Sequence, residues 1–185
     1  RAIERNLVKK GEATIIYPTV DFSRFENLKP EKSEKSFVYY SRLNPPKRQD
    51  VLLEAWKIFV KKHPEFSLKI IGSIDNPAYF EKLKKLVKET KNVEIKTDVS
   101  NKELEEIISK SEAGIFLGYE EDFGIVPFEI LCAKKPLIAV DKGGYVDLIG
   151  KNPNFFKVKE KHNAKEMALE IGKTLEKFVG AKKNN

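Results

Sequence analysis

Apolar and polar positions follow two alternating patterns along the chain. Short, nearly continuous apolar runs predict buried strands, and segments in which apolar residues recur every three or four positions predict helices. The predicted strands cover residues 13–18, 37–41, 67–72, 93–95, 113–117, 137–140 and 155–158. The predicted helices run from about residue 50 to 63, from residue 76, from residue 101, from about residue 124 to a stop at Pro136, and from residue 164 to about 179.

Strands and helices that alternate in this way are typical of βαβ units. They predict an α/β fold with a Rossmann-like parallel sheet and helices on both faces. The 185 residues suffice for one well-buried domain, which we expect at residues 37–180. Residues 1–36 are expected to be an interdomain linker that includes the first strand. Within this segment, residues 1–10 are expected to be the end of a helix that Gly11 caps.

Residues at the predicted helix ends support these boundaries. Asp50 is predicted to be the N-cap of the first helix of the domain, and Asn76 followed by proline starts the second. Ser100 and Glu103 have the spacing of a capping box at the third. In the last helix the predicted apolar stripe consists of Met167, Leu169, Ile171, Leu175 and Phe178.

Composition narrows the class of protein. Hydrophobic residues make up 41% of the chain and charged residues 34%, and no apolar run is long enough to predict a membrane span. Cys132 is the only cysteine, so a disulfide scaffold is excluded and a reducing compartment, the cytoplasm, is expected. His63 and His162 are isolated, so no metal site is predicted.

The net charge of +7 raises the question of a nucleic-acid partner, but its distribution argues against one. Eight lysines and four glutamates lie between Lys157 and Asn185, with no arginine-rich helix or aromatic-basic ladder beside them. A solvated lysine-rich surface is favoured. Peripheral contact with an anionic membrane surface or a lipid-linked phosphate stays open, and it would place the protein at the inner face of the membrane.

Candidate binding residues follow several predicted strands. Arg42, Lys47, Gly72, Glu121 and Gly143 each come after a strand, although they are dispersed along the chain. The carboxyl ends of parallel strands meet at one edge of a sheet, and ligands bind there. The sequence therefore predicts that these residues converge around one ligand.

The stretch 120–140, EEDFGIVPFEILCAKKPLIAV, predicts a loop, a short helix and a strand. The N-terminus of such a helix presents free N–H groups and a partial positive charge. Glu121 and Glu129 could contact sugar hydroxyls there, and Arg42 and Lys47 could neutralise a diphosphate. This chemistry suits a nucleotide-sugar, because fixed cations stabilise a departing diphosphate without a metal. The residues alone also allow a solvated acidic loop and a surface Arg and Lys in a proline-rich turn.

The same stretch resembles the signature of the large retaining glycosyltransferase family four, also described as glycosyl transferases group 1. That signature has two glutamates separated by seven residues, Phe-Gly after the first and a proline before the next strand. The matching residues are Glu121, Phe123, Gly124, Glu129 and Pro136.

A second match lies after the predicted strand at residues 37–41. The family carries an arginine and a lysine five residues apart, and Arg42 and Lys47 have this spacing. The resemblance implies that both cations hold the diphosphate of the donor. It implies that Glu121 is the catalytic carboxylate that contacts the donor sugar and that Glu129 binds the ribose. It further implies donor-binding roles for Gly72, Val99, Phe123, Gly124 and Ile125.

The chain departs from the family pattern at two positions of physical interest. Arg48 stands where glycine is usual, and we expect it either to add a third cation or to point to solvent. Lys134 replaces the usual glycine after the motif helix, where a left-handed backbone conformation is expected.

The resemblance implies one half of a GT-B fold, the donor-binding domain, with the N-terminal acceptor domain absent from this chain. The full enzyme would transfer a sugar with retention to a hydroxyl in glycan or glycolipid synthesis, without a cofactor. GDP-mannose is the first expected donor and UDP-sugars are the next. A glycan or lipid-linked acceptor would be bound mainly by the missing domain. Two alternatives remain: a non-catalytic nucleotide-binding module and a basic nucleic-acid-binding α/β domain.

Overall fold

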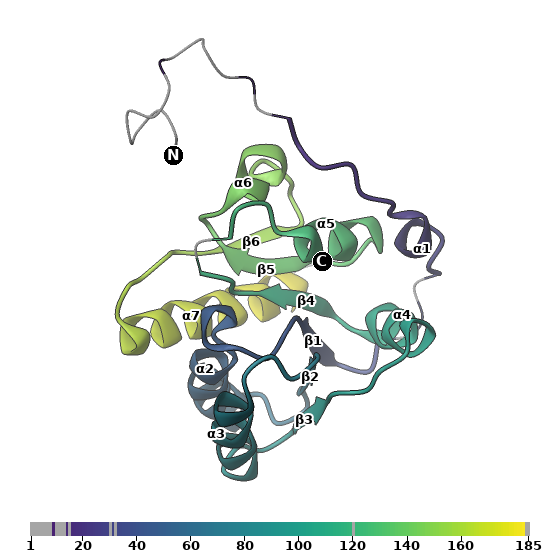
Figure 1. Cartoon of the computed structure of the whole chain (residues 1–185). Helices are drawn as coiled ribbons and strands as arrows, with labels where there is room; N and C mark the ends of the chain where they lie inside the picture. The colour runs from purple at the N-terminus through teal and green to yellow at the C-terminus, as the bar shows by residue number, and fades with distance from the viewer. Residues whose placement is uncertain are drawn as a thin grey trace.

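The computed structural model describes residues 9, 14, 16–29, 31, 33–119 and 121–183. These residues form a six-stranded sheet in which all neighbouring strands are parallel. This confirms the predicted Rossmann-like α/β fold. The strand order is β3-β2-β1-β4-β5-β6 (Figure 1). The strands are β1 Ser36–Tyr40, β2 Ser67–Ile71, β3 Val93–Lys96, β4 Ala113–Phe116, β5 Leu137–Val140 and β6 Phe155–Val158.

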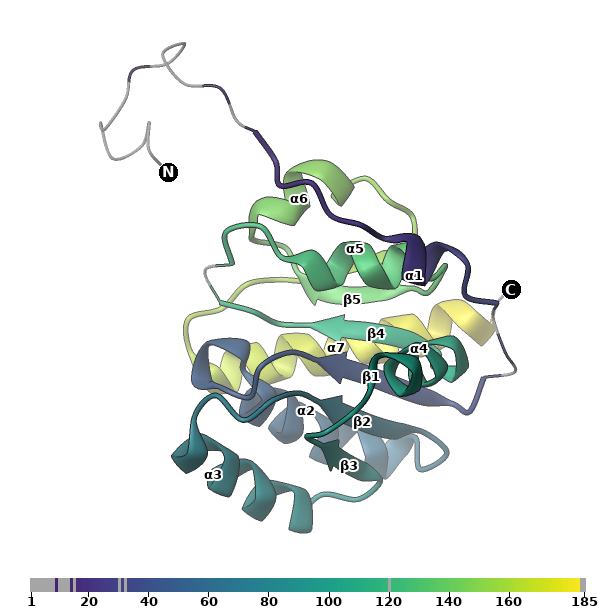
Figure 2. The ribbon, with the colours of Figure 1, turned by 45° about the vertical axis from the view of Figure 1, so that its right-hand side comes forward.

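Helices cover both faces of the sheet. Figure 1 shows α2, α3 and α7 on one side of the strands and α4 and α5 on the other, and Figure 2 shows α1 alongside α5. Strand addition reverses direction between β1 and β4, which makes a topological switch point where ligands of such sheets bind. The helices are α1 Ser23–Glu26, η1 Pro45–Lys47, α2 Gln49–Lys62, α3 Pro77–Lys88, α4 Asn101–Lys110, α5 Ile125–Cys132, α6 Gly144–Ile149 and α7 Ala164–Lys183.

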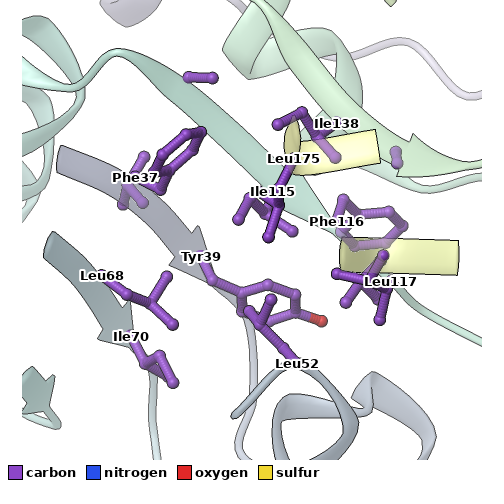
Figure 3. Packing of buried hydrophobic residues seen from close by; sticks show 14 of the residues in the cluster. Phe37, Tyr39, Leu52, Leu68, Ile70, Ile115, Phe116, Leu117, Ile138 and Leu175 are labelled. Atoms are coloured by element: carbon purple, nitrogen blue, oxygen red, sulfur yellow. The ribbon is translucent and has the colours of Figure 1, made fainter. Parts of the chain in front are cut away.

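The hydrophobic core surrounds the two central strands. All five residues of β1 are buried, as expected for a parallel strand between two layers of helices. Figure 3 shows Phe37 and Tyr39 of β1 among buried side chains of β2, β4, β5 and α7. The Phe37 ring centroid lies 5.6 Å from that of Trp56 on α2 and 5.5 Å from that of Phe178 on α7. Burial of one such ring contributes about 1.5–3 kcal/mol, so the core fixes the strand ends that carry the site.

Two predictions about helices are wrong. Asp50 is not the N-cap of α2: Arg48 has that position, and the Asp50 carboxylate accepts a 2.8 Å hydrogen bond from the Tyr79 hydroxyl. Leu169 is 57% exposed. The buried stripe of α7 runs through Met167 and Ile171, four residues apart, and Leu169 between them points away from the sheet. The capping bond from the Glu103 N–H to Ser100 Oγ is present at 3.2 Å.

The predicted first strand at residues 13–18 is also wrong where it can be assessed. Residues 16–18 form no strand, and Ile16 is 88% exposed, so no packing stabilises an extended edge there. The predicted helix over residues 1–10 falls almost wholly outside the described residues. Among the described residues, no helix combines the length and apolarity needed to cross a bilayer.

Candidate functional site

A cavity of about 420 Å³ opens at the carboxyl ends of β1 and β4, at the switch point of the sheet. Its walls come from the loop after β1, the loop after β4 and the start of α5. The cavity is lined by residues that the sequence predicted and by others that it did not. They are Pro18, Ser41, Arg42, Lys47, Phe116, Glu121, Asp122, Phe123, Gly124, Ile125 and Val126. Of the five residues predicted to converge at this edge, Arg42, Lys47 and Glu121 line the cavity, and Gly72 and Gly143 do not.

Lys47 and Glu121 form an ion pair at this cavity. The two side chains are only 16% and 22% exposed, and the Lys47 ammonium also lies 5.5 Å from the ring centroid of Phe116. The lysine is carried by the short turn η1, whose two prolines restrict the backbone. The hydroxyl of Tyr39 donates to the Lys47 carbonyl, so the backbone of the cation is anchored to β1.

Arg42 lies on the same side of the cavity but is held loosely. Its side chain is 64% exposed, and its guanidinium lies 3.6 Å from the Asp75 carboxylate. Asp75 also accepts a 2.7 Å hydrogen bond from Asn44 Nδ2. An exposed ion pair of this kind contributes at most about 1 kcal/mol, so a bound anion can readily redirect the guanidinium.

The N-terminus of α5 forms another part of the wall. Gly124, its N-cap, has φ 78° and ψ 89°, and a Cβ atom there would lie 2.8 Å from the Tyr145 ring. Only glycine fits this conformation and this contact without strain. The first N–H groups of α5 are unpaired within the helix, and the residues that carry them, Ile125 and Val126, line the cavity. Phe123 stacks on Phe128 at 5.0 Å between ring centroids, which fixes the loop before the helix.

Glu129 lies one turn further into α5 and outside the cavity lining. Its Oε2 atom accepts a 2.9 Å hydrogen bond from the Tyr40 hydroxyl at the end of β1. Burial raises the pKa of the Glu129 carboxyl, and the Tyr40 hydrogen bond opposes that shift. Oε1 has no hydrogen-bond partner within the described part of the chain. The two motif glutamates therefore have distinct environments.

Gly72 and Val99 do not line this cavity. A Cβ atom at Gly72 would lie 1.7 Å from the carbonyl oxygen of Ser41, so glycine is required by the close approach of the loops after β1 and β2. Val99 is half-buried against the core before α4. Their donor-binding roles remain predictions.

Two glycines after β5 support the Glu121 loop. Gly143 has φ 137°, and a Cβ atom at Gly144 would lie 1.9 Å from the carbonyl oxygen of Asp122. The Gly144 N–H donates to the Glu121 carbonyl at 3.2 Å. The Gly-Gly turn therefore lets the backbones of two loops touch beside the cavity. The sequence predicted Gly143 at this edge of the sheet, but it did not indicate a contact of this turn with Glu121 and Asp122.

Both departures from the family pattern have a structural explanation. Lys134 has φ 58°, which confirms the expected left-handed conformation. Arg48 neither adds a cation to the cavity nor points to solvent: its guanidinium binds the carboxylate of Glu160, and the two side chains are 12% and 11% exposed. Both alternatives expected for Arg48 are therefore wrong. The Glu160 carboxylate, in the loop after β6, lies within reach of the guanidinium, and the sequence did not indicate this contact.

A second hollow, of about 500 Å³, lies between α2, α3 and α7. Two of the charged residues that line it, Asp50 and Lys82, form an ion pair with each other. Ile58 and Leu169 give it an apolar wall. Because convergent polar groups are found instead at the carboxyl edge, we assign the candidate site there. No group of three His, Cys, Asp or Glu side chains in the described ranges is arranged to hold a metal ion.

The parallel sheet, with cations, carboxylates and a helix N-terminus gathered at its switch point, defines a Rossmann-like ligand-binding domain. Comparison with known proteins specifies the family. The chain belongs to the family described as glycosyl transferases group 1, which matches residues 20–183.

Individual relatives include enzymes that transfer different sugars. The chain is 30% identical over 176 residues to a poly(ribitol-phosphate) alpha-N-acetylglucosaminyltransferase of Staphylococcus aureus, covering 90% of the chain and 34% of that protein. It is 26% identical over 161 residues to a GDP-Man:Man(3)GlcNAc(2)-PP-Dol alpha-1,2-mannosyltransferase of Candida glabrata, covering 78% of the chain and 32% of that protein. The chain thus spans about a third of the length of these curated relatives.

Solved structures show the same fold. A glycosyltransferase from Rickettsia africae superposes with a TM-score of 0.75 at 23% identity, covering 95% of this chain and 50% of that one. Anabaena Alr3699/HepE, solved in complex with UDP and glucose, superposes with a TM-score of 0.72 at 18% identity and the same coverage. At these identities the likeness establishes the fold.

Proposed function

We propose that this chain is the nucleotide-sugar-binding half of a GT-B glycosyltransferase. The observation that carries the proposal is the cavity in which Arg42, Lys47, Glu121 and the start of α5 meet at the switch point. Residues 37–180 form the donor-binding domain and residues 1–36 lead into it from an acceptor domain. The short span of the chain relative to its curated relatives supports this division.

The proposed mechanism begins with exchange of partners at Lys47. In the structure the Lys47 ammonium is paired with the Glu121 carboxylate. A diphosphate brings more negative charge than one carboxylate, and the N–H groups of α5 add donors, so the phosphate takes the lysine and attracts Arg42. Glu121 is then released to accept hydrogen bonds from hydroxyls of the donor sugar.

Sugar transfer breaks the bond between the anomeric carbon and the diphosphate oxygen. Negative charge grows on the leaving diphosphate, where Arg42 and Lys47 stabilise it without a metal. The new bond forms to an acceptor hydroxyl, whose proton leaves with the departing diphosphate, and we propose retention at the anomeric carbon. Glu129 binds the ribose through the oxygen that Tyr40 leaves unused. This positioning contributes to rate only when a second domain holds the acceptor against the sugar.

GDP-mannose is the proposed donor, with UDP-sugars as the competing class. Relatives named as mannosyltransferases support the first, and the UDP in the Anabaena complex supports the second. The acceptor is a hydroxyl of a glycan or lipid-linked glycan, handled in the cytoplasm at the inner face of the membrane. The exposed lysines of α7 support contact with anionic headgroups.

A thermal-shift panel of GDP-mannose, UDP-glucose, UDP-N-acetylglucosamine, GDP and UDP tests the proposal, with guanosine and uridine as controls. A ligand at 100 times its Kd should stabilise the chain by about 2.7 kcal/mol. Saturable binding of one nucleotide class, followed by transfer once an acceptor domain is supplied, supports the enzyme. Binding without transfer in the two-domain protein would instead indicate a non-catalytic module. Absence of diphosphate binding would overturn the proposal.

A further inference from the structure

Arg48 combines an unfavourable backbone conformation with a well-formed side-chain interaction. It is the N-cap of α2, with φ 59° and ψ 31°, in the left-handed region that a Cβ atom disfavours. Glycine would make this turn without strain, so the turn itself does not require arginine. The side chain must therefore contribute something that glycine cannot.

The Arg48 guanidinium forms two hydrogen bonds to one carboxylate. NH1 donates to Glu160 Oε2 at 3.0 Å and NH2 donates to Glu160 Oε1 at 2.7 Å. The guanidinium carbon also lies 4.6 Å from the ring centroid of Tyr119. Glu160 is itself fixed, because its N–H donates to Asp141 Oδ1 at 2.8 Å. Both partners of the pair are nearly buried, so solvent screens the interaction little.

These contacts join the loops after β1, β4 and β6 around the backbone of Lys47. The Tyr119 N–H donates to the Pro46 carbonyl at 2.8 Å, on one side of Lys47. Arg48 and its carboxylate partner hold the other side. Residues 45–48 are therefore attached to two neighbouring loops, while only the Lys47 side chain enters the cavity.

We propose that Arg48, paired with Glu160 and stacked on Tyr119, is a positioning residue that sets where the Lys47 ammonium meets the donor diphosphate. This inference rests on the proposed function. Arg48 does not line the cavity, and Glu160 neutralises its charge, so it acts through Lys47 and not as a phosphate ligand. Loosening the pair should impair recognition of phosphate and leave recognition of the nucleoside intact.

The test compares Arg48→Gly and Glu160→Gln with a matched control, Glu112→Gln. Arg48→Gly removes the side chain while relieving the backbone. Glu112 is as buried as Glu160, with an 11% exposed side chain, and it pairs with Lys182 beside the amino end of β4. Its substitution breaks an ion pair with an equally buried carboxylate at the opposite edge of the sheet, although its partner Lys182 is 49% exposed and Arg48 only 12%.

Calorimetry should show that Arg48→Gly and Glu160→Gln weaken binding of GDP or UDP by roughly tenfold, the size expected for coupled neighbouring residues. Binding of guanosine or uridine should change less than about twofold, and Glu112→Gln should alter neither. Equal losses for nucleoside and diphosphate, or a lowered Tm with unchanged affinities, would show a merely structural pair and overturn the inference.

Hydrogen exchange of the ligand-free chain separates this inference from the proposed function. The amides of residues 47–49 should exchange about tenfold faster in Glu160→Gln and at the original rate in Glu112→Gln. If no diphosphate binds the unmodified chain, the proposed function is wrong, and so is the role of Arg48 in positioning Lys47 for phosphate. This holds even if the exchange rates show that the Arg48–Glu160 pair restrains the backbone of Lys47. Unchanged exchange rates overturn the inference whatever the nucleotide results.

Discussion

Lys47 and Glu121 are 74 positions apart in the chain and form an ion pair at the mouth of the sheet. The pair joins the loop after β1 to the loop after β4, across the switch point. A nucleoside diphosphate that needs the lysine must first compete with this carboxylate. Substitutions of the two partners should therefore have opposite effects on binding.

Lys47→Ala should weaken binding of GDP or UDP by about 10- to 100-fold, since a hydrogen bond to a charged group contributes about 1.5–3 kcal/mol. Binding of the corresponding nucleoside should be unchanged. Calorimetry with both ligands measures the difference. Lys182→Ala is the matched control, because it removes an ion-paired lysine at the opposite edge of the sheet. Equal losses for nucleoside and diphosphate would refute the phosphate role.

Glu121→Gln should strengthen binding of the bare diphosphates by up to about fivefold, because Lys47 no longer has to leave a charged partner. In a two-domain enzyme, the same substitution should lower kcat far more than nucleotide affinity, because the carboxylate contacts the reacting sugar. Titration of the isolated chain and steady-state kinetics of the enzyme test the two statements separately. A loss of diphosphate affinity without a loss of kcat would reverse the assigned role.

Glu129→Gln should raise the Tm at neutral pH while weakening nucleotide binding. Burial raises the pKa of this carboxyl in the folded chain. The contribution of the carboxyl to stability is therefore fully present below its unfolded pKa of about 4.3. That contribution is lost as the pH rises through the folded pKa. Glutamine resembles the protonated form and can still accept from Tyr40. The gain in Tm should thus be present at pH 7.5 and absent at pH 4, as calorimetric scans would show. A lower Tm at pH 7.5 would contradict this account.

Donor binding should survive chelation. Two cations and the first N–H groups of α5 face the cavity, and the described residues offer no cluster of three metal-ligating side chains. The Kd for GDP or UDP should therefore change less than about twofold in EDTA. A large loss that magnesium or manganese restores would mean that a metal ion bridges the diphosphate.

Lys134→Gly should stabilise the chain by about 0.5–1 kcal/mol, because the left-handed conformation at φ 58° strains a residue with a Cβ atom. This corresponds to a Tm increase of about 1–4 °C for a domain of this size. Lys134→Ala is the control, since alanine retains the strain. Equal Tm changes for the two variants would show that the lysine side chain, and not the backbone, limits stability.

The sheet could be predicted well from the sequence, because apolar runs and helical repeats alternate clearly along the chain and are joined by short connections. Arg42, Lys47 and Glu121 could be placed together, since residues after parallel strands share one edge. Partners of individual side chains could not be predicted. The pairing of Arg48 with Glu160 depends on two loops 112 positions apart, and neither residue's neighbours in sequence indicate the other. Leu169 was misplaced because a lysine-rich helix gives an ambiguous apolar stripe.

The central position of β1 has a consequence for biosynthesis. β1 is translated before its neighbour β4, which follows only after β2 and β3, and Phe37 of β1 pairs with Ala113 of β4. The helix α2, which covers β1, packs against α7, which follows β6 in the sequence. Such non-local contacts delay folding and leave apolar surface uncovered during translation. The rings of Phe37 and Trp56 therefore stay incompletely covered in the nascent polypeptide until α7 has been translated, so the demand for chaperones should be highest just before α7 emerges.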